Sequence, residues 1–207
     1  MLIKLTVQEF AQRLADGNPT PGGGSAAALA GALGAGLVSM FCEITAGRKK
    51  YAEVKAEMEE TARFARQWQA RLLELVDLDS AAYDKVLAAY RLPKETDPEK
   101  EARRQAIDAA NLEATRTPLE TASCCVQVLG RIAPLAAKGN PNAISDLKVG
   151  LELLATAFAG ARANVEINLP WLPEEAGAEI RRQIETLGAK AHRAAEEGRQ
   201  AIARVQA

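Results

Sequence analysis

The sequence has little histidine, few cysteines and almost no net charge. One histidine, His192, and three cysteines occur in 207 residues. A single histidine without a Cys/His cluster supports neither a zinc centre nor a Ser-His-Asp hydrolase. Lysine and arginine number 26 against 27 aspartates and glutamates, so no excess of one sign draws the whole chain to nucleic acid or to an anionic membrane. His192 lies in a charged segment and is expected at the surface.

The cysteines are predicted to be buried thiols. Cys124 and Cys125 are adjacent and could join only through a strained ring, and Cys42 shows no metal-ligand spacing to either. This usage favours a reducing cytoplasm. The N-terminus lacks the apolar core of a secretory signal. We expect no uninterrupted apolar run to approach the length of roughly 20 residues that a bilayer-spanning helix needs. We therefore expect a cytoplasmic protein that binds neither nucleic acid nor membrane.

Runs of β-branched residues with period-two alternation are also missing. Long alanine-rich and charged segments dominate instead, separated by short clusters of proline, glycine and asparagine. No stretch resembles a long flexible linker. The sequence therefore predicts an all-α protein, a single-domain bundle of long helices over residues 1–207.

Capping residues predict where several helices begin. Thr6 followed by Glu9 forms a capping box for a short helix that ends near residue 16. Ser25 is the expected N-cap of a helix over 26–46, and Asp97 that of a helix with Pro98 in its first turn. The other expected features are a long amphipathic helix over 51–90, a kink at Pro118, and helices over 143–168 and from about 174 to the end.

Three consecutive glycines stand directly before the helix expected at 26–46, in the stretch "PTPGGGS". Such a turn exposes backbone N–H groups at the positive end of a helix dipole, where an anion or the polar edge of a ligand can approach closely. The stretch lacks the lysine and hydroxyl residue of a phosphate-binding P-loop and follows a helix rather than a strand. A merely tight turn is the alternative interpretation.

The helix behind the turn is built almost wholly from small residues. Gly31, Gly34 and Gly36 each cost roughly 1 kcal/mol against alanine in a helix interior. Close helix packing is the expected compensation, either within the subunit or across a symmetric dimer axis. The expected contact ridge consists of Ala27, Gly31, Gly34, Ala35 and Val38.

A second unusual stretch, "KGNPNAISDLKVG", places Asn140, Asn142 and Asp146 around a helix start. Asn142 and Asp146 are four residues apart and would share a helix face. A capped helix with an acidic residue near its positive end is the alternative. Asn164 follows Asp146 by five helical turns, roughly 27 Å, so one ligand in one subunit could not readily contact both.

Several stretches together resemble one enzyme family: "PTPGGGSAAALAGALGAGL", "GRKKY", "LVDLDSAAYDKV", "YRLPKETDPEKEARRQAI" and "KGNPNAISDLKVGLELLATAFAGARANVEINL". In this order they are similar to the formiminotetrahydrofolate cyclodeaminases and methenyltetrahydrofolate cyclohydrolases, and they span nearly the whole chain. The resemblance is to the free-standing bacterial form. It implies an all-helical, obligate-type homodimer that binds folate at its subunit interface, with no metal and no cofactor beyond the tetrahydrofolate-derived substrate.

The activity implied first is cyclisation of 5-formiminotetrahydrofolate to 5,10-methenyltetrahydrofolate with release of ammonia. The alternatives are 5,10-methenyltetrahydrofolate cyclohydrolase activity in the same pocket and a non-catalytic folate-binding helical dimer. Asp146 is the candidate catalytic residue, because a carboxylic acid in a confined site could shuttle the proton that either reaction needs. The same carboxylate could instead anchor the N–H donors of the pterin.

The residues expected to bind substrate are spread along the chain. Lys49 and Lys50 could meet the glutamate tail of folate or form a solvated basic turn. Asp79 could line the pocket or be an exposed acidic position on a long helix. The full expected set is Gly22, Gly23, Gly24, Ser25, Lys49, Lys50, Asp79, Asn140, Asn142, Ser145 and Asn164.

Overall fold

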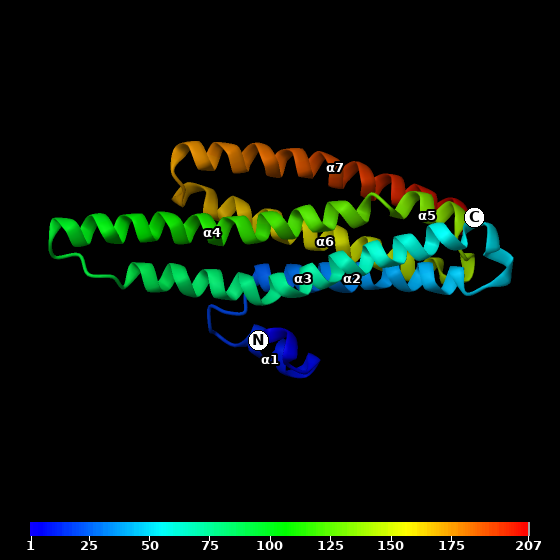
Figure 1. Ribbon diagram of the computed structural model, residues 1–207, viewed down its shortest axis with the longest axis horizontal. Coiled ribbons are helices and arrows are strands. Elements are labelled where there is room, and N and C mark those ends of the chain that lie inside the picture. Colours follow the sequence, from blue (N-terminus) through cyan, green and yellow to red (C-terminus); the bar gives the residue numbers. More distant parts are fainter. Residues whose placement is uncertain (207) are drawn as a thin grey trace.

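The computed structural model describes residues 1–206, and within this range the chain forms helices and turns with no β-strand. The expected all-α fold is confirmed. The elements are α1 (Val7–Ala15), α2 (Gly23–Ala46), α3 (Lys55–Tyr90), α4 (Asp97–Leu129), α5 (Ile132–Lys138), α6 (Ile144–Asn168) and α7 (Glu174–Gln206), with 3-10 turns η1 (Leu2–Lys4), η2 (Lys49–Val54), η3 (Pro141–Ala143) and η4 (Leu169–Trp171). The five long helices form an elongated bundle, and α1 stands apart from it (Figure 1).

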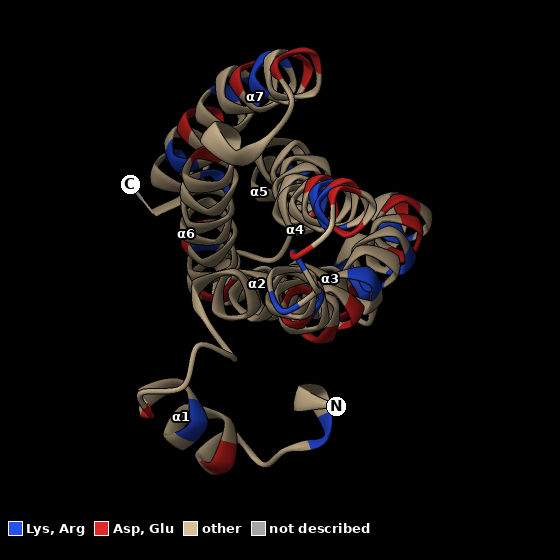
Figure 2. Ribbon diagram, turned by 90° about the vertical axis from the view of Figure 1, so that its left-hand side faces the viewer, with Lys and Arg blue, Asp and Glu red and all other residues tan. Residues whose placement is uncertain are grey.

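Helix α2 packs between α3 and α6 along one edge of the bundle (Figure 2). By length and composition alone it is apolar enough to cross a membrane, so the expectation that no apolar run approaches this length is wrong. Most of α2 is buried inside the bundle. Contacts with α3 and α6 explain the apolar character of its buried face, whereas Leu33 and Met40 of the same helix stay exposed.

The glycines of α2 make close helix contacts within the subunit. A Cβ atom added at Gly34 would lie 2.8 Å from the carbonyl oxygen of Gly150 and 2.8 Å from Cγ of Leu154, both on α6. A Cβ at Gly31 would lie 3.1 Å from Sγ of Cys125 and 3.2 Å from Leu72. Of the two arrangements expected for the small-residue ridge, packing within the subunit is therefore the one found at these positions.

Local capping signals fixed some helix boundaries and missed others. The capping box of Thr6 and Glu9 opens α1 as predicted. The expected N-caps at Ser25 and Asp97 are wrong. Helix α2 begins at Gly23, two residues before Ser25, and the side chain of Ser25 hydrogen-bonds to α3 instead. Helix α4 is capped by Thr96, whose side chain forms a capping box with Glu99.

Helix α4 continues through Pro118, which lies inside it. Proline has no backbone N–H, so the carbonyl of Ala114, four residues earlier, lacks its ordinary helical donor. The side-chain nitrogen of Asn168, at the end of α6, donates to this carbonyl at 3.2 Å. The irregularity in α4 thus fixes the orientation of a side chain on α6.

The three cysteines are buried and free, as predicted. Burial is the main cause that raises the pKa of the Cys42 and Cys124 thiols to about 12, and it raises that of Cys125 as well. His192 is exposed on α7, also as predicted.

Candidate active site

A cavity of about 410 Å³ opens where the glycine turn meets the C-terminal end of α6. Its walls come from the turn, the second half of α3, the first half of α4, the end of α6 and η4. The lining residues are Pro19, Thr20, Gly22, Gly23, Gly24, Asp79, Tyr83, Val86, Tyr90, Asn111, Ala114, Asn164, Ile167, Asn168 and Trp171. Segments distant in sequence therefore converge here, as expected for a ligand site.

Two polar side chains lie against the glycines of the turn, and one of them leaves no room for a side chain at position 24. A Cβ atom at Gly24 would lie 2.0 Å from Oδ1 of Asp79, and one at Gly23 would lie 3.4 Å from Nδ2 of Asn164. No residue in the described range has a positive φ, so close approach rather than backbone conformation requires glycine at position 24. The turn brings a carboxylate from α3 and a carboxamide from α6 to the N-terminus of α2.

Ser25 connects Asp79 to the body of the protein. Its Oγ lies 2.9 Å from Oδ2 of Asp79, 3.0 Å from the carbonyl oxygen of Val76 and 3.1 Å from Oγ of Ser80. A hydroxyl has one proton to donate, whereas the carbonyl and an ionised carboxylate can only accept. When Asp79 is ionised, Ser25 can donate to it; when Asp79 is protonated, it can donate to Ser25, which then donates to Val76. The network accommodates both protonation states of Asp79.

Asp79 is half-buried, and burial raises its pKa above the ordinary aspartate value. Hydrogen bonds from the side chain and the backbone of Ser25 act in the opposite direction, because they stabilise the charged form. A carboxyl group with a raised pKa beside a cavity is a candidate for general acid–base catalysis.

Three asparagines line the same cavity. The side-chain nitrogen of Asn164 donates to the carbonyl of Gly160 at 2.8 Å, and that of Asn111 donates to the carbonyl of Trp171 at 3.4 Å. Asn168 donates to α4 as described above. Each carboxamide is therefore held by its nitrogen, which leaves its oxygen free to accept from a ligand.

Aromatic side chains form the outer part of the cavity and were missed by sequence reasoning. Tyr83, Tyr90 and Trp171 line it and are 40, 44 and 62% exposed. A helical spacing could have found the first two, because Asp79, Tyr83, Val86 and Tyr90 follow one another at steps of four, three and four residues and so share one face of α3. Trp171 carries no such signal. Exposed aromatic rings at a cavity mouth suit a flat heteroaromatic ligand.

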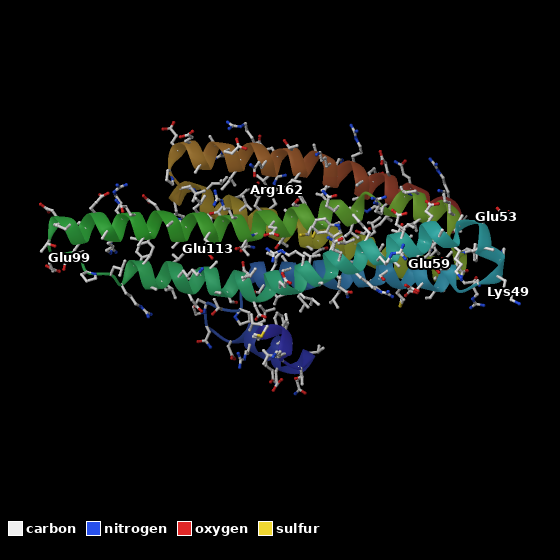
Figure 3. All side chains as sticks on the ribbon, viewed as in Figure 1. Lys49, Glu53, Glu59, Glu99, Glu113 and Arg162 are labelled. Carbon is white, nitrogen blue, oxygen red and sulfur yellow. The ribbon has the colours of Figure 1, made fainter. Side chains whose placement is uncertain are left out.

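The remaining predicted site residues lie at the other end of α2 and α6. The backbone N–H of Asn140 donates to Oγ1 of Thr45 near the end of α2, and its side-chain oxygen accepts from the backbone N–H of Asn142. Asn140 therefore caps the short turn η3, whereas α6 itself begins at Ile144 without a side-chain cap. Asn142 and Ser145 are exposed and Asp146 is half-buried at the start of α6. Lys49 and Lys50 lie in the exposed turn η2 at the same end of the bundle, as the label of Lys49 shows in Figure 3.

Within one subunit, the structure thus divides the predicted set into two groups. Gly22, Gly23, Gly24, Asp79 and Asn164 line the cavity. Ser25 lies behind them. The second group, at the opposite end of α2, consists of Lys49, Lys50, Asn140, Asn142, Ser145 and Asp146.

The fold has a known counterpart, and the sequence identifies the family. It matches the crystal structure of formiminotetrahydrofolate cyclodeaminase from Thermotoga maritima with a TM-score of 0.89 over 100% of both chains, at 24% sequence identity. Residues 6–186 match the sequence model of the formiminotransferase-cyclodeaminase family. The chain belongs to this family, whose members act in folate one-carbon chemistry as cyclodeaminases or cyclohydrolases, and it is an enzyme of one of these two kinds.

Two named relatives represent these two activities. The chain is 42% identical over 190 residues to the methenyltetrahydrofolate cyclohydrolase of Methylorubrum extorquens, with 90% of each protein covered. It is 34% identical over 168 residues to the formimidoyltransferase-cyclodeaminase of Rattus norvegicus, covering 81% of this chain and 31% of that protein. The chain thus spans about a third of the length of the bifunctional relative.

Proposed function

We propose that the protein is a 5,10-methenyltetrahydrofolate cyclohydrolase that uses the cavity at the glycine turn. The observation that carries this proposal is the half-buried carboxylate of Asp79, held against Gly24 and hydrogen-bonded to Ser25 beside a cavity with three asparagines. The choice of reaction follows the similarity to the Methylorubrum enzyme, which is higher than that to the rat protein and extends over 90% of both chains.

The proposed chemistry is addition of water to the methenyl carbon between N5 and N10 of the substrate. Ionised Asp79 accepts a proton from the attacking water, and the carbon–oxygen bond forms as the positive charge on the amidinium is neutralised. The protonated carboxyl then returns this proton to N5 as the carbon–N5 bond breaks. The hydroxyl group of the adduct loses its proton to solvent as the C=O bond forms, which leaves a formyl group on N10; one water is consumed.

Cyclodeamination is the second candidate, favoured by the similarity to the rat protein. In this reaction N10 attacks the formimino carbon on N5 and passes its proton to the formimino nitrogen; the bond from the carbon to this nitrogen then breaks, ammonia leaves and the methenyl bridge remains. The leaving nitrogen needs a proton, which Asp79 in its protonated form would supply. 5,10-Methenyltetrahydrofolate is the product of this reaction and the substrate of the cyclohydrolase reaction, and both would use the carboxyl group of Asp79. The two reactions differ in whether N10 or water adds to the carbon.

We also propose that the enzyme acts as a homodimer through the exposed face of α2 and α6. Glu43 is the one charged residue in the sequence of α2. Leu33 and Val149 are each 53% exposed, and they precede Gly34 and Gly150, which touch where the two helices pack together. Exposed large apolar residues on and beside a helix with a single charge are typical of a subunit interface.

A two-fold axis near Leu33 would bring together the two groups of predicted residues. The glycine turn and Asp79 lie at one end of the α2–α6 pair, and Asp146 lies at the other, roughly 27 Å along α6 from Asn164. Antiparallel pairing of two copies places the partner's Asp146 beside the cavity of the first subunit. In this arrangement Asp79 transfers protons, and the partner's Asp146 binds the substrate or assists the transfer.

Two assays carried out side by side test the proposed activity. The purified protein should remove the absorbance of 5,10-methenyltetrahydrofolate faster than the buffer does, and it should release ammonia from 5-formiminotetrahydrofolate slowly or not at all. The opposite ratio would assign cyclodeaminase activity. Absence of turnover with both substrates, together with tight folate binding, would identify a carrier and refute the enzymatic proposal.

A further inference from the structure

The asparagines of the cavity have defined orientations. Each side-chain nitrogen lies at hydrogen-bond distance from a backbone carbonyl, and a carbonyl can only accept. The amide group that faces the carbonyl must therefore be the NH₂, not the oxygen. For Asn168 the reason lies in the sequence of α4, because Pro118 leaves the carbonyl of Ala114 without its helical donor.

The three Oδ1 atoms are consequently available to a ligand. Asn111, Asn164 and Asn168 all line the cavity. Within residues 1–206 no protein group donates to these oxygens. They are also accessible to solvent, because the buried side-chain atoms without a partner in this range are Nε1 of Trp68 and Oδ2 of Asp77. Asn111 is only 9% exposed, so its open side faces the cavity. With Asp79, these asparagines give the cavity four carboxamide or carboxylate groups with acceptor oxygens, beside the hydroxyls of Thr20, Tyr83 and Tyr90.

A cavity lined by these acceptor oxygens favours a ligand edge that is rich in N–H donors. Among the parts of a tetrahydrofolate, the aminopyrimidinone edge of the pterin has this character, because its N3–H and 2-amino group donate side by side. The aminobenzoate ring and the glutamate tail offer mainly an apolar face and carboxylates, which would meet the acceptors unfavourably. The aromatic side chains at the mouth fit these outer parts instead.

We propose that Asn111, Asn164 and Asn168 are the pterin-recognition residues of this enzyme, which accept hydrogen bonds from the N3–H and 2-amino edge through their side-chain oxygens. This inference rests on the proposed folate substrate and goes beyond it by assigning the orientation of the ring. The pterin enters with its donor edge toward the asparagines of α4 and α6.

A comparison of two ligands on the same protein tests the assignment without turnover. The ligands are tetrahydrofolate and its analogue with a methyl group in place of the 2-amino group, and their dissociation constants are measured by calorimetry. Removing a donor whose acceptor is held in a cavity leaves that acceptor unpaired, so the wild type should bind the analogue at least about tenfold more weakly.

The discrimination ratio is the dissociation constant of the analogue divided by that of tetrahydrofolate. It should fall when an asparagine that recognises the 2-amino group is removed. Replacing each asparagine in turn by alanine should reduce the ratio to about threefold or less in at least one variant. Gln127→Ala removes an exposed carboxamide from α4 outside the cavity and should leave the ratio unchanged. Because the ratio compares two ligands on one variant, partial loss of folded protein affects both measurements alike.

Three results would overturn the proposal. A wild type that binds tetrahydrofolate but does not discriminate against the analogue would refute the recognition of the 2-amino edge while leaving the folate substrate in place. A ratio that is the same in all three alanine variants would assign the discrimination to other residues. A wild type that binds neither ligand would refute this assignment together with the proposed function.

Discussion

A single methyl group added at Gly34 is expected to destabilise the bundle. In Gly34→Ala the new Cβ would lie 2.8 Å from the carbonyl oxygen of Gly150, 2.8 Å from Cγ of Leu154 and 3.1 Å from the backbone nitrogen of Leu154. Two of these three atoms belong to the backbone of α6, so the helices must move apart rather than a side chain rotate. Such overpacking costs about 1–3 kcal/mol, and we place this site toward the upper end.

The better helix propensity of alanine opposes this cost by about 1 kcal/mol. The net loss is about 1–2 kcal/mol, which for a chain of this length corresponds to a decrease in Tm of about 2–8 °C. Thermal unfolding at one fixed protein concentration measures it, because dimer formation would make Tm depend on concentration.

Gly188→Ala is the matched control within a helix. Its Cβ would meet the guanidinium of Arg162 at an ordinary contact distance of 3.4 Å, so propensity alone should act and Tm should rise by about 2–4 °C. The two substitutions therefore differ in sign. A Gly34→Ala variant as stable as the wild type or more stable would refute the close contact of α2 with α6.

Three further predictions concern the site and the thiols. Asp79→Asn should lower turnover at least about tenfold yet raise Tm at neutral pH. Burial raises the pKa of Asp79, so the stability that its protonated form contributes is lost as pH rises through that pKa. The gain in Tm should vanish below the ordinary aspartate pKa of about 4, and the exposed control Asp84→Asn should change neither turnover nor Tm. Changing Lys49 and Lys50 to alanine should raise KM more for polyglutamylated than for monoglutamylated substrate, and an equal rise for both would contradict contact with the tail. The native cysteines should react with a disulfide reagent at pH 8 far more slowly than in the unfolded chain, and fast native labelling would contradict their burial.

The sequence predicted the helices well because their signals are local. The capping box at Thr6, the start of α7 and the loops around them depend on residues a few positions apart. The errors at Ser25 and Asp97 have a common cause. Each residue is a good N-cap by type, but the hydroxyl of Ser25 bonds to α3, and Thr96 forms a complete capping box one position before Asp97.

The candidate site was predictable only in part. The glycine turn was recognisable as a place of close approach, but its neighbour Asp79 lies 55 positions after Gly24, and no local pattern joins the two. The role of Asn168 depends on a proline in another helix. For Asp146 the local sequence was recognised but was ambiguous, because the same pattern fits an acidic residue at a helix start and a catalytic group. Only the arrangement of two subunits would distinguish these roles.

The most direct test of the account is a mixed dimer of two inactive variants. Asp79→Asn and Asp146→Asn chains with different affinity tags are co-expressed, and the heterodimer is purified through both tags. If each active site combines Asp79 of one subunit with the partner's Asp146, one site of the heterodimer carries both changes and the other carries none, so it should have about half the wild-type activity. Each homodimer should be at least about tenfold slower than wild type. A heterodimer as inactive as its parents would place both carboxylates in sites within one subunit, and an active Asp146→Asn homodimer would remove Asp146 from the site; either result would contradict the shared active site.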